Sequence, residues 1–200
     1  MKLSKRNTAI LVVSALLILS VWAGIIISLG EGAGDAVLAI KTPPKVSISE
    51  NESVVVDVTI SDLGETLYPA MSANILFDPS RLEFAGLKEG NVFIRDDRSS
   101  SGQSLPEFSC NVKHSNQTGR INLIYLDLSG GKYAFDRALL AKEDNVIFRL
   151  EFRLRGSVRK GDVCDLVIED AVFAASDESQ SLATLTNTLK AKNGKIVIGE

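Results

Sequence analysis

Few residues in this 200-residue chain have the types and spacing that covalent catalysis needs. His114 is the only histidine and lies beside an expected turn, which is a poor setting for a general base. Asp78 and Glu83 could form the carboxylate pair of a glycosidase, but Asp78 precedes a proline, where an aspartate more often caps a turn. The sequence has no esterase, nucleotide-binding or zinc-protease motif. We therefore predict no catalytic residue and no enzyme activity.

Candidate metal ligands are also sparse. Asp170, Asp177 and Glu178 surround an expected loop and could hold a calcium ion, but they lack the alternating spacing of a calcium-binding loop. Two cysteines with one histidine do not form a zinc site at the usual spacings. We predict no bound metal and no cofactor.

The two cysteines, Cys110 and Cys164, share their strand parity with apolar neighbours. Phe108 and Val112 flank the first in this way, and Leu166 follows the second. This pattern predicts two buried thiols that act as small hydrophobic side chains. The alternative is a single disulfide bond, which is permissible if the domain lies outside the cell.

Two Asn-x-Ser/Thr sequons begin at Asn51 and Asn116, and both fall in predicted turns. They predict surface glycans at these two residues in a source that glycosylates such sites, and they fit a domain outside the cell.

The N-terminal region has the pattern of a membrane anchor. Residues 8–29 contain no charged side chain, and as a helix they would span roughly 33 Å, against about 30 Å for the hydrocarbon core of a bilayer. Lys2, Lys5 and Arg6 precede this segment and nothing comparable follows closely. The positive-inside rule therefore places residues 1–7 in the cytoplasm and the body of a single-pass protein outside the cell. The alternative is a signal peptide cleaved near Ala23, which would give a secreted protein.

Beyond the anchor, residues 30–36 read as a linker and residues 37–200 as one domain. Setting aside Lys2, Lys5 and Arg6, 19 of the 22 basic residues remain against 25 acidic ones, a net charge of about −6. An acidic body argues against a nucleic-acid partner, because phosphates need a basic face.

The segment 71–87 organises the predicted fold. Apolar and other residues alternate from 71 to 77, which is the pattern of a half-buried strand. Asp78-Pro79-Ser80 then breaks the strand, and an apolar face resumes from Leu82. Residues 108–112 and 120–128 are predicted to form a hairpin around a turn at 115–119. Other predicted strands cover residues 37–40, 46–49, 54–60, 145–155, 164–174 and 195–198.

A change of period after residue 131 predicts one short helix, capped by Asp136 and running through residues 139–141. About nine short strands with alternating faces and one short helix predict an all-β fold, an antiparallel β-sandwich.

Several stretches together resemble the cohesin family, whose members are nine-stranded jelly-roll sandwiches. Residues 72–84 (SANILFDPSRLEF) are similar to the strand–corner–strand motif of that family, and residues 119–131 (GRINLIYLDLSGG) to a later strand. Residues 146–154, 170–174 and 194–198 complete the pattern. The likeness covers roughly residues 37–199, and its specificity comes from the order and spacing of the motifs. The expected anchor replaces the multidomain scaffold of the family, and no dockerin follows.

In cohesins, one sheet face binds the dockerin of a partner, and the calcium belongs to that dockerin. The resemblance implies a partner-binding face that includes Ser72, Asn74, Asn122, Ile124 and Asp127.

The sequence therefore predicts a membrane-anchored, extracellular cohesin-like module that captures a dockerin-bearing or similar partner at the cell surface. The alternative is a carbohydrate-binding module that acts in polysaccharide attachment or breakdown. The scarcity of aromatic residues weakens it, since the single Trp lies in the membrane segment and only Tyr68, Tyr125 and Tyr133 are tyrosines. A third hypothesis is a surface-appendage subunit whose apolar N-termini pack together.

Overall fold

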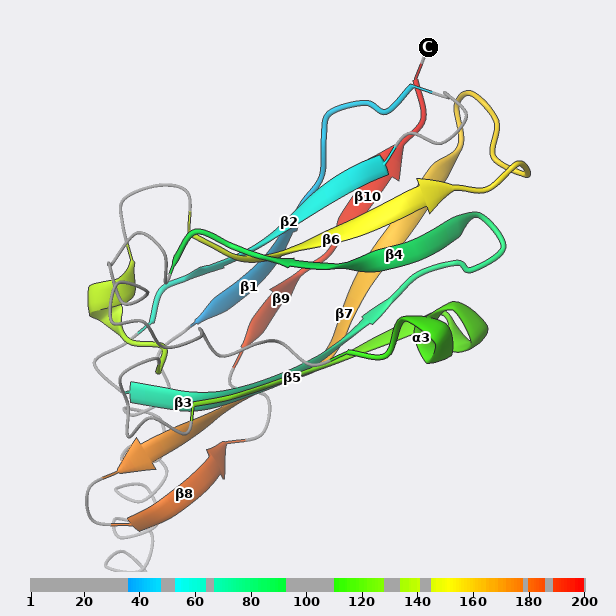
Figure 1. Cartoon of the computed structure of the whole chain (residues 1–200). Coiled ribbons are helices and arrows are strands. Elements are labelled where there is room, and N and C mark those ends of the chain that lie inside the picture. The colour runs from blue at the N-terminus through cyan, green and yellow to red at the C-terminus, as the bar shows by residue number, and fades with distance from the viewer. Residues whose placement is uncertain are drawn as a thin grey trace, which may run out of the picture. The chain divides into compact units, whose positions relative to one another are not determined.

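The structure, a computed structural model, describes residues 36–47, 53–63, 67–92, 110–127, 134–140, 145–177, 180–185 and 189–199 (Figure 1). These residues form ten strands, one α-helix and one 3-10 turn. The elements are β1 (Val37–Lys41), β2 (Ser53–Ser61), β3 (Leu67–Leu76), β4 (Leu82–Glu89), α3 (Val112–Thr118), β5 (Arg120–Leu126), η2 (Arg137–Leu139), β6 (Val146–Leu154), β7 (Val163–Asp177), β8 (Gln180–Leu185), β9 (Lys190–Lys192) and β10 (Gly194–Val197).

The strands form two sheets that pack face to face. One sheet has the order β4-β6-β2-β1-β9, and the other has the order β10-β7-β3-β5 with β8 paired to β7. The predicted all-β sandwich with a short helix is confirmed. The antiparallel description is incomplete, because β1 pairs with β9 in parallel and Val46 bridges Ile198 in parallel. The first described strand therefore lies beside β9, near the end of the described chain.

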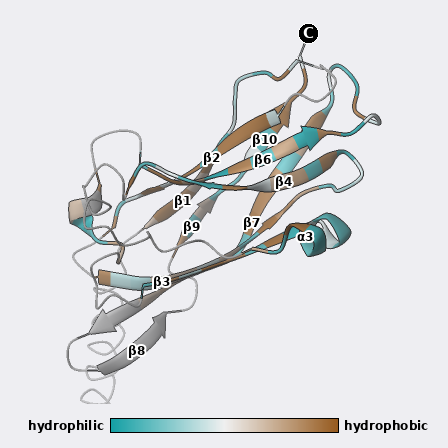
Figure 2. Ribbon diagram, in the orientation of Figure 1, coloured by the Kyte–Doolittle hydropathy of each residue, from teal (hydrophilic) through white to brown (hydrophobic). Residues whose placement is uncertain are grey.

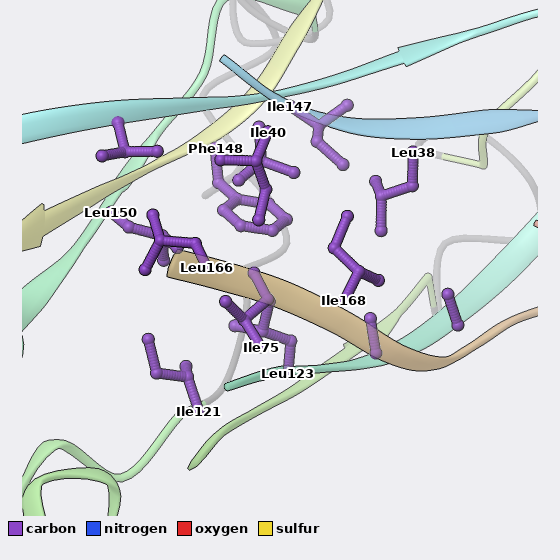
Figure 3. Packing of buried hydrophobic residues seen from close by; sticks show 14 of the residues in the cluster. Leu38, Ile40, Ile75, Ile121, Leu123, Ile147, Phe148, Leu150, Leu166 and Ile168 are labelled. Carbon is purple, nitrogen blue, oxygen red and sulfur yellow. The ribbon is translucent and has the colours of Figure 1, made fainter. Parts of the chain in front are cut away.

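Alternating side chains explain why these segments are strands. In β5 the inward residues Ile121, Leu123 and Tyr125 are buried, whereas the residues between them are exposed. Figure 3 shows the resulting core, in which Ile75, Leu123 and Ile168 from one sheet lie near Phe148 and Leu150 from the other. Burial of these side chains, at about 25 cal/mol per Å² of apolar surface, is the main stabilising contribution to the fold.

The predicted corner after residue 77 carries the chain from one sheet to the other, because β3 and β4 belong to different sheets. The backbone oxygen of Asp78 accepts hydrogen bonds from Arg81 N (3.1 Å) and Leu82 N (2.9 Å). Its carboxylate accepts from Ser80 N (2.9 Å) and Ser80 Oγ (2.6 Å). Asp78 thus closes the turn, as the sequence predicted.

The hydrogen bonds from Ser80, first its hydroxyl and then its backbone N–H, hold the pKa of Asp78 below its ordinary value. A carboxylate with a lowered folded-state pKa stabilises the fold above its unfolded pKa, near 3.8, and this contribution disappears as the pH falls through the folded value. We expect Ser80→Ala to raise the pKa of Asp78 and to lower the free energy of unfolding at pH 7. The difference from the unmodified protein should shrink in acid. NMR titration of the Asp78 carboxyl and denaturation at several pH values check this; an unchanged pKa would contradict it.

Residues 108 and 109 of the predicted strand at 108–112 lie outside the described part of the chain, residues 110–112 do not form a strand, and the predicted turn at 115–119 is wrong. Residues 112–118 form α3 instead, and β5 pairs with β3 rather than with a preceding hairpin strand. The helix begins where the Asn111 side chain accepts a hydrogen bond from His114 N, and it ends at Gly119, whose φ of 70° is left-handed. A Cβ at Gly119 would lie 2.6 Å from Phe77 O, so this position also requires the missing side chain.

Asn116 fastens α3 to β4, which is an edge strand of its sheet. Its Oδ1 accepts from Phe84 N and its Nδ2 donates to Phe84 O, both at 2.8 Å, and Nδ2 also donates to Val112 O at 3.1 Å. The side-chain amide thus forms the same pair of hydrogen bonds with β4 that the backbone of a neighbouring strand would form. A glycan on Nδ2 would displace one of these bonds. Glycosylation of Asn116 stays a prediction, and Asn51 lies outside the described residues.

We expect Asn116→Ala to destabilise the protein by about 1–3 kcal/mol, because the half-buried N–H and C=O of Phe84 lose their partner. Chemical denaturation of protein from a host without N-glycosylation measures this. The neighbouring Gln117→Ala is the matched control, since Gln117 is exposed on the same helix, and a change within about 0.5 kcal/mol is expected there. Equal stability of both variants would show that the Asn116 bonds contribute nothing.

The short helix predicted near residues 136–141 is a single 3-10 turn, η2. The predicted anchor at residues 8–29 and residues 30–35 of the predicted linker lie outside the described part of the chain, whereas Ala36, the last residue of that linker, is buried in the core. Within the described part, no helix has the length and apolar character to cross a membrane.

Candidate partner-binding face

The outward side of the β7-β3-β5 sheet brings together four of the residues predicted to bind a partner. Ser72 lies opposite Ile124, and Asn74 opposite Asn122, in adjacent rows of the β3–β5 pair. We call the outward residues of β3, β5 and β7 the binding face. That these four residues contact a partner stays a prediction.

One end of the binding face is apolar. Ile124 is 60% exposed and Leu126 48% exposed, and Leu126 pairs with the half-buried Ala70. On the other side of β3, Val172 pairs with Ser72 and Ala174 with Ala70. Exposed apolar side chains grouped on a flat sheet mark an interaction surface. The sequence analysis omitted Leu126, although it lies two residues after Ile124 and the strand period could have found it.

The other end of the binding face is a polar cluster. Asn74 Nδ2 donates to Asp170 Oδ2 at 3.0 Å. Arg120 Nη2 donates to Glu169 Oε2 at 3.0 Å and to Asp170 Oδ2 at 3.3 Å. Two carboxylates therefore surround one guanidinium, so this end carries a negative charge.

A β-bulge explains why both acids point outward. Between the pairs Ser72–Val172 and Asn74–Glu169, β7 has two residues where β3 has one. Asp170 has a φ of 50°, in the left-handed region that aspartate tolerates better than most residues. The bulge turns Glu169 and Asp170 to the same side, where a regular strand would alternate them.

Asp127 does not lie on the binding face with the other four residues, so the structure does not bring the whole predicted set together. It is 7% exposed, and strand alternation places it on the opposite side from Asn122 and Ile124. Its backbone N–H donates to Pro69 O at 2.7 Å, which ties the end of β5 to β3.

The residues considered for chemistry lie apart from this face. Asp78 closes the corner, and Glu83 on β4 lies 3.9 Å from Arg153 and 3.8 Å from Arg155 in ion pairs of the other sheet. His114 is exposed on α3. Among the described residues no group of three or more His, Cys, Asp or Glu side chains could hold a metal ion, and Glu178 lies outside them.

Both cysteine thiols are free, which confirms their prediction as unpaired side chains. Cys164 is buried on β7, and Cys110 is half-buried and packs against the core. Burial raises the pKa of both thiols, so the reactive thiolate is scarce at neutral pH.

The fold is a two-layered β-sandwich, and one of its sheets has an outward face that is apolar at one end and polar at the other. Together they define a β-sandwich module with one sheet face open to a partner. The model of one family, described as the cohesin domain, matches residues 42–198. The chain therefore belongs to the cohesin domain family.

Solved cohesins share this fold. The third cohesin of ScaC from Acetivibrio cellulolyticus, solved with the ScaB dockerin, is 17% identical with a TM-score of 0.58, over 82% of this chain and 99% of that one. The cohesin of OlpA from Clostridium thermocellum, solved with the dockerin Doc918, is 19% identical with a TM-score of 0.55, over 82% and 98%. The cohesin CaCohA2 from Clostridium acetobutylicum is 20% identical with a TM-score of 0.52, over 82% and 91%. The sequence has no match among curated proteins.

Proposed function

We propose that this protein is a membrane-anchored cohesin that captures a dockerin-bearing partner through the binding face, outside the cell. The exposed pair Ile124 and Leu126 carries the proposal, because two large apolar side chains on the solvent-facing side of one strand cost solubility unless a partner covers them. Family membership supplies the partner class, since relatives of the same fold are solved with dockerins. The uncharged segment 8–29 supports the anchor.

The two ends of the face have different roles in this proposal. The apolar end supplies most of the binding energy, because desolvated apolar anchors dominate protein interfaces. The polar cluster of Asn74, Arg120, Glu169 and Asp170 fixes orientation and disfavours partners that place carboxylates against it.

A capture experiment tests the proposal. The full chain, solubilised in a nonionic detergent and immobilised, is exposed to purified dockerin-bearing proteins of the source organism, in calcium and in chelator. Specific retention in calcium and release in chelator are expected, because the calcium belongs to the dockerin. Failure to retain any of these proteins in calcium would reject the dockerin as partner.

Carbohydrate binding is not favoured by the described residues. Tyr68 and Tyr125 are buried at 1% exposure each. Inside the core, the Tyr68 ring stacks on Phe173 and the Tyr125 ring packs at a tilt against Phe135. Neither tyrosine therefore presents a flat ring to a sugar.

A further inference from the structure

The outer side of the other sheet contains a hollow of about 450 Å³ over β1, β2 and β9. Its size falls in the range of small-molecule sites, roughly 300–1,000 Å³. It lies on the sheet that does not carry the binding face. We call it the β1–β9 hollow, and its lining includes Ala39, Lys41, Thr59, Ser61 and Lys192.

Strand register explains why the surface is hollow there. Lys192 pairs with Ala39, and Ala39 pairs with Thr59, so the three residues form one row across β9, β1 and β2. Ala39 is the smallest member of the row, and Thr59 is 6% exposed with its Oγ1 donating to Ala39 O at 3.4 Å. These short side chains form the floor. Lys41 and Lys192 are exposed and also line the hollow.

The described lining is basic. It contains two lysines and no acidic side chain, although the body of the protein carries a net negative charge. The acid opposite Lys41 is Asp57, and Arg149 Nε already lies 3.1 Å from its Oδ1. At the other end, Asp62 Oδ2 accepts the hydroxyl hydrogen of Ser61 at 2.9 Å.

The same sheet carries another exposed cation outside the hollow. Lys88 on β4 pairs with Glu151 on β6, and the side chain of Lys88 is 66% exposed against 20% for Glu151. The cation thus stands further into solvent than its partner.

We propose that the β1–β9 hollow binds an organic phosphate of about the size of a sugar phosphate, with Lys41 and Lys192 holding the phosphate group. Lysine binds phosphate as a point charge with three donors, and a hollow lined by two lysines and by small side chains offers charge for the phosphate group and room for an organic substituent. The site and the binding face lie on different sheets, so phosphate and protein partner bind independently of one another.

Titration calorimetry on the full chain in nonionic detergent, at low and at physiological salt, tests the proposal. The probes are glucose 1-phosphate, inorganic phosphate and glucose. Saturable binding of glucose 1-phosphate is expected, with weaker binding of phosphate and none of glucose. Lys41→Gln and Lys192→Gln should each weaken binding about tenfold, the effect of one charge-assisted hydrogen bond.

Two further variants distinguish a specific binding site from nonspecific attraction to a basic surface. Ala39→Leu fills the floor of the hollow without changing any charge, and it should weaken binding about tenfold as well. Lys88→Gln removes an exposed cation of the same sheet outside the hollow, and it should change binding less than about twofold. No saturable binding of glucose 1-phosphate, or equal losses in Lys88→Gln and Lys192→Gln with none in Ala39→Leu, would overturn the proposal.

Discussion

Replacing Ile124 by aspartate is expected to weaken dockerin binding by at least about 2 kcal/mol, roughly thirty-fold in Kd. Ile124 is the most exposed large apolar side chain in the described part of the chain, and it lies between Asn122 and Leu126 on the edge strand β5. A carboxylate there would be desolvated against the partner without a counter-charge, and it would add to the negative charge of Glu169 and Asp170. Calorimetry or surface plasmon resonance with a purified dockerin measures the effect.

Val55→Asp is the matched control for this substitution. Val55 is also a β-branched residue in the middle of a strand, is 39% exposed, and faces outward from β2 on the other sheet. The same new charge at Val55 should leave the affinity unchanged within about twofold. If Val55→Asp weakens binding as much as Ile124→Asp does, the partner does not use the β7-β3-β5 face.

Truncating Phe152 to alanine is expected to lower the free energy of unfolding by about 3–5 kcal/mol, a large part of the stability of a domain of this size. Phe152 on β6 is fully buried. Its ring centroid lies 5.5 Å from that of Phe77, which follows β3 in the opposite sheet, and 5.7 Å from that of Phe84 on β4. The side chain therefore joins both layers beneath the corner, and its loss leaves a cavity between them.

Phe152→Leu provides the comparison, because it keeps an apolar side chain and should cost about 1–2 kcal/mol. Denaturation by guanidinium, followed by circular dichroism, gives both values. A loss below about 1 kcal/mol for the alanine variant would mean that the layers close over the cavity without penalty.

Strand alternation made much of this architecture predictable. The period of two assigned Ser72 and Asn74 to outward positions, the family resemblance implied Asn122 and Ile124, and the structure places all four on one sheet face. The Asp78-Pro79-Ser80 corner could be predicted equally well from the sequence, because its hydrogen bonds join residues only two positions apart. Asp127 lies on the inward side, as the same period of two indicates, whereas the family resemblance implied that it belongs to the partner-binding face.

Other features depend on contacts that sequence patterns do not encode. Residues 112–118 are too short and too polar to distinguish a helix from a turn, and Figure 2 shows α3 as largely hydrophilic. The bonds from Asn116 to Phe84, 32 positions earlier, and the cap at Asn111 decide the outcome. The polar cluster likewise needs the bulge at Asp170, which arises from the register of β3 against β7.

The parallel pairing of β1 with β9 affects how the domain resists a mechanical pulling force. Val37 pairs with Lys190 at one end of this seam, and Val46 bridges Ile198 at the other, next to the final described residues. A pull on the two ends of the sandwich therefore runs along the strands, and it loads the hydrogen bonds of the seam in shear, all together instead of one by one. Shear loading of this kind gives mechanical resistance, which is a property separate from equilibrium stability.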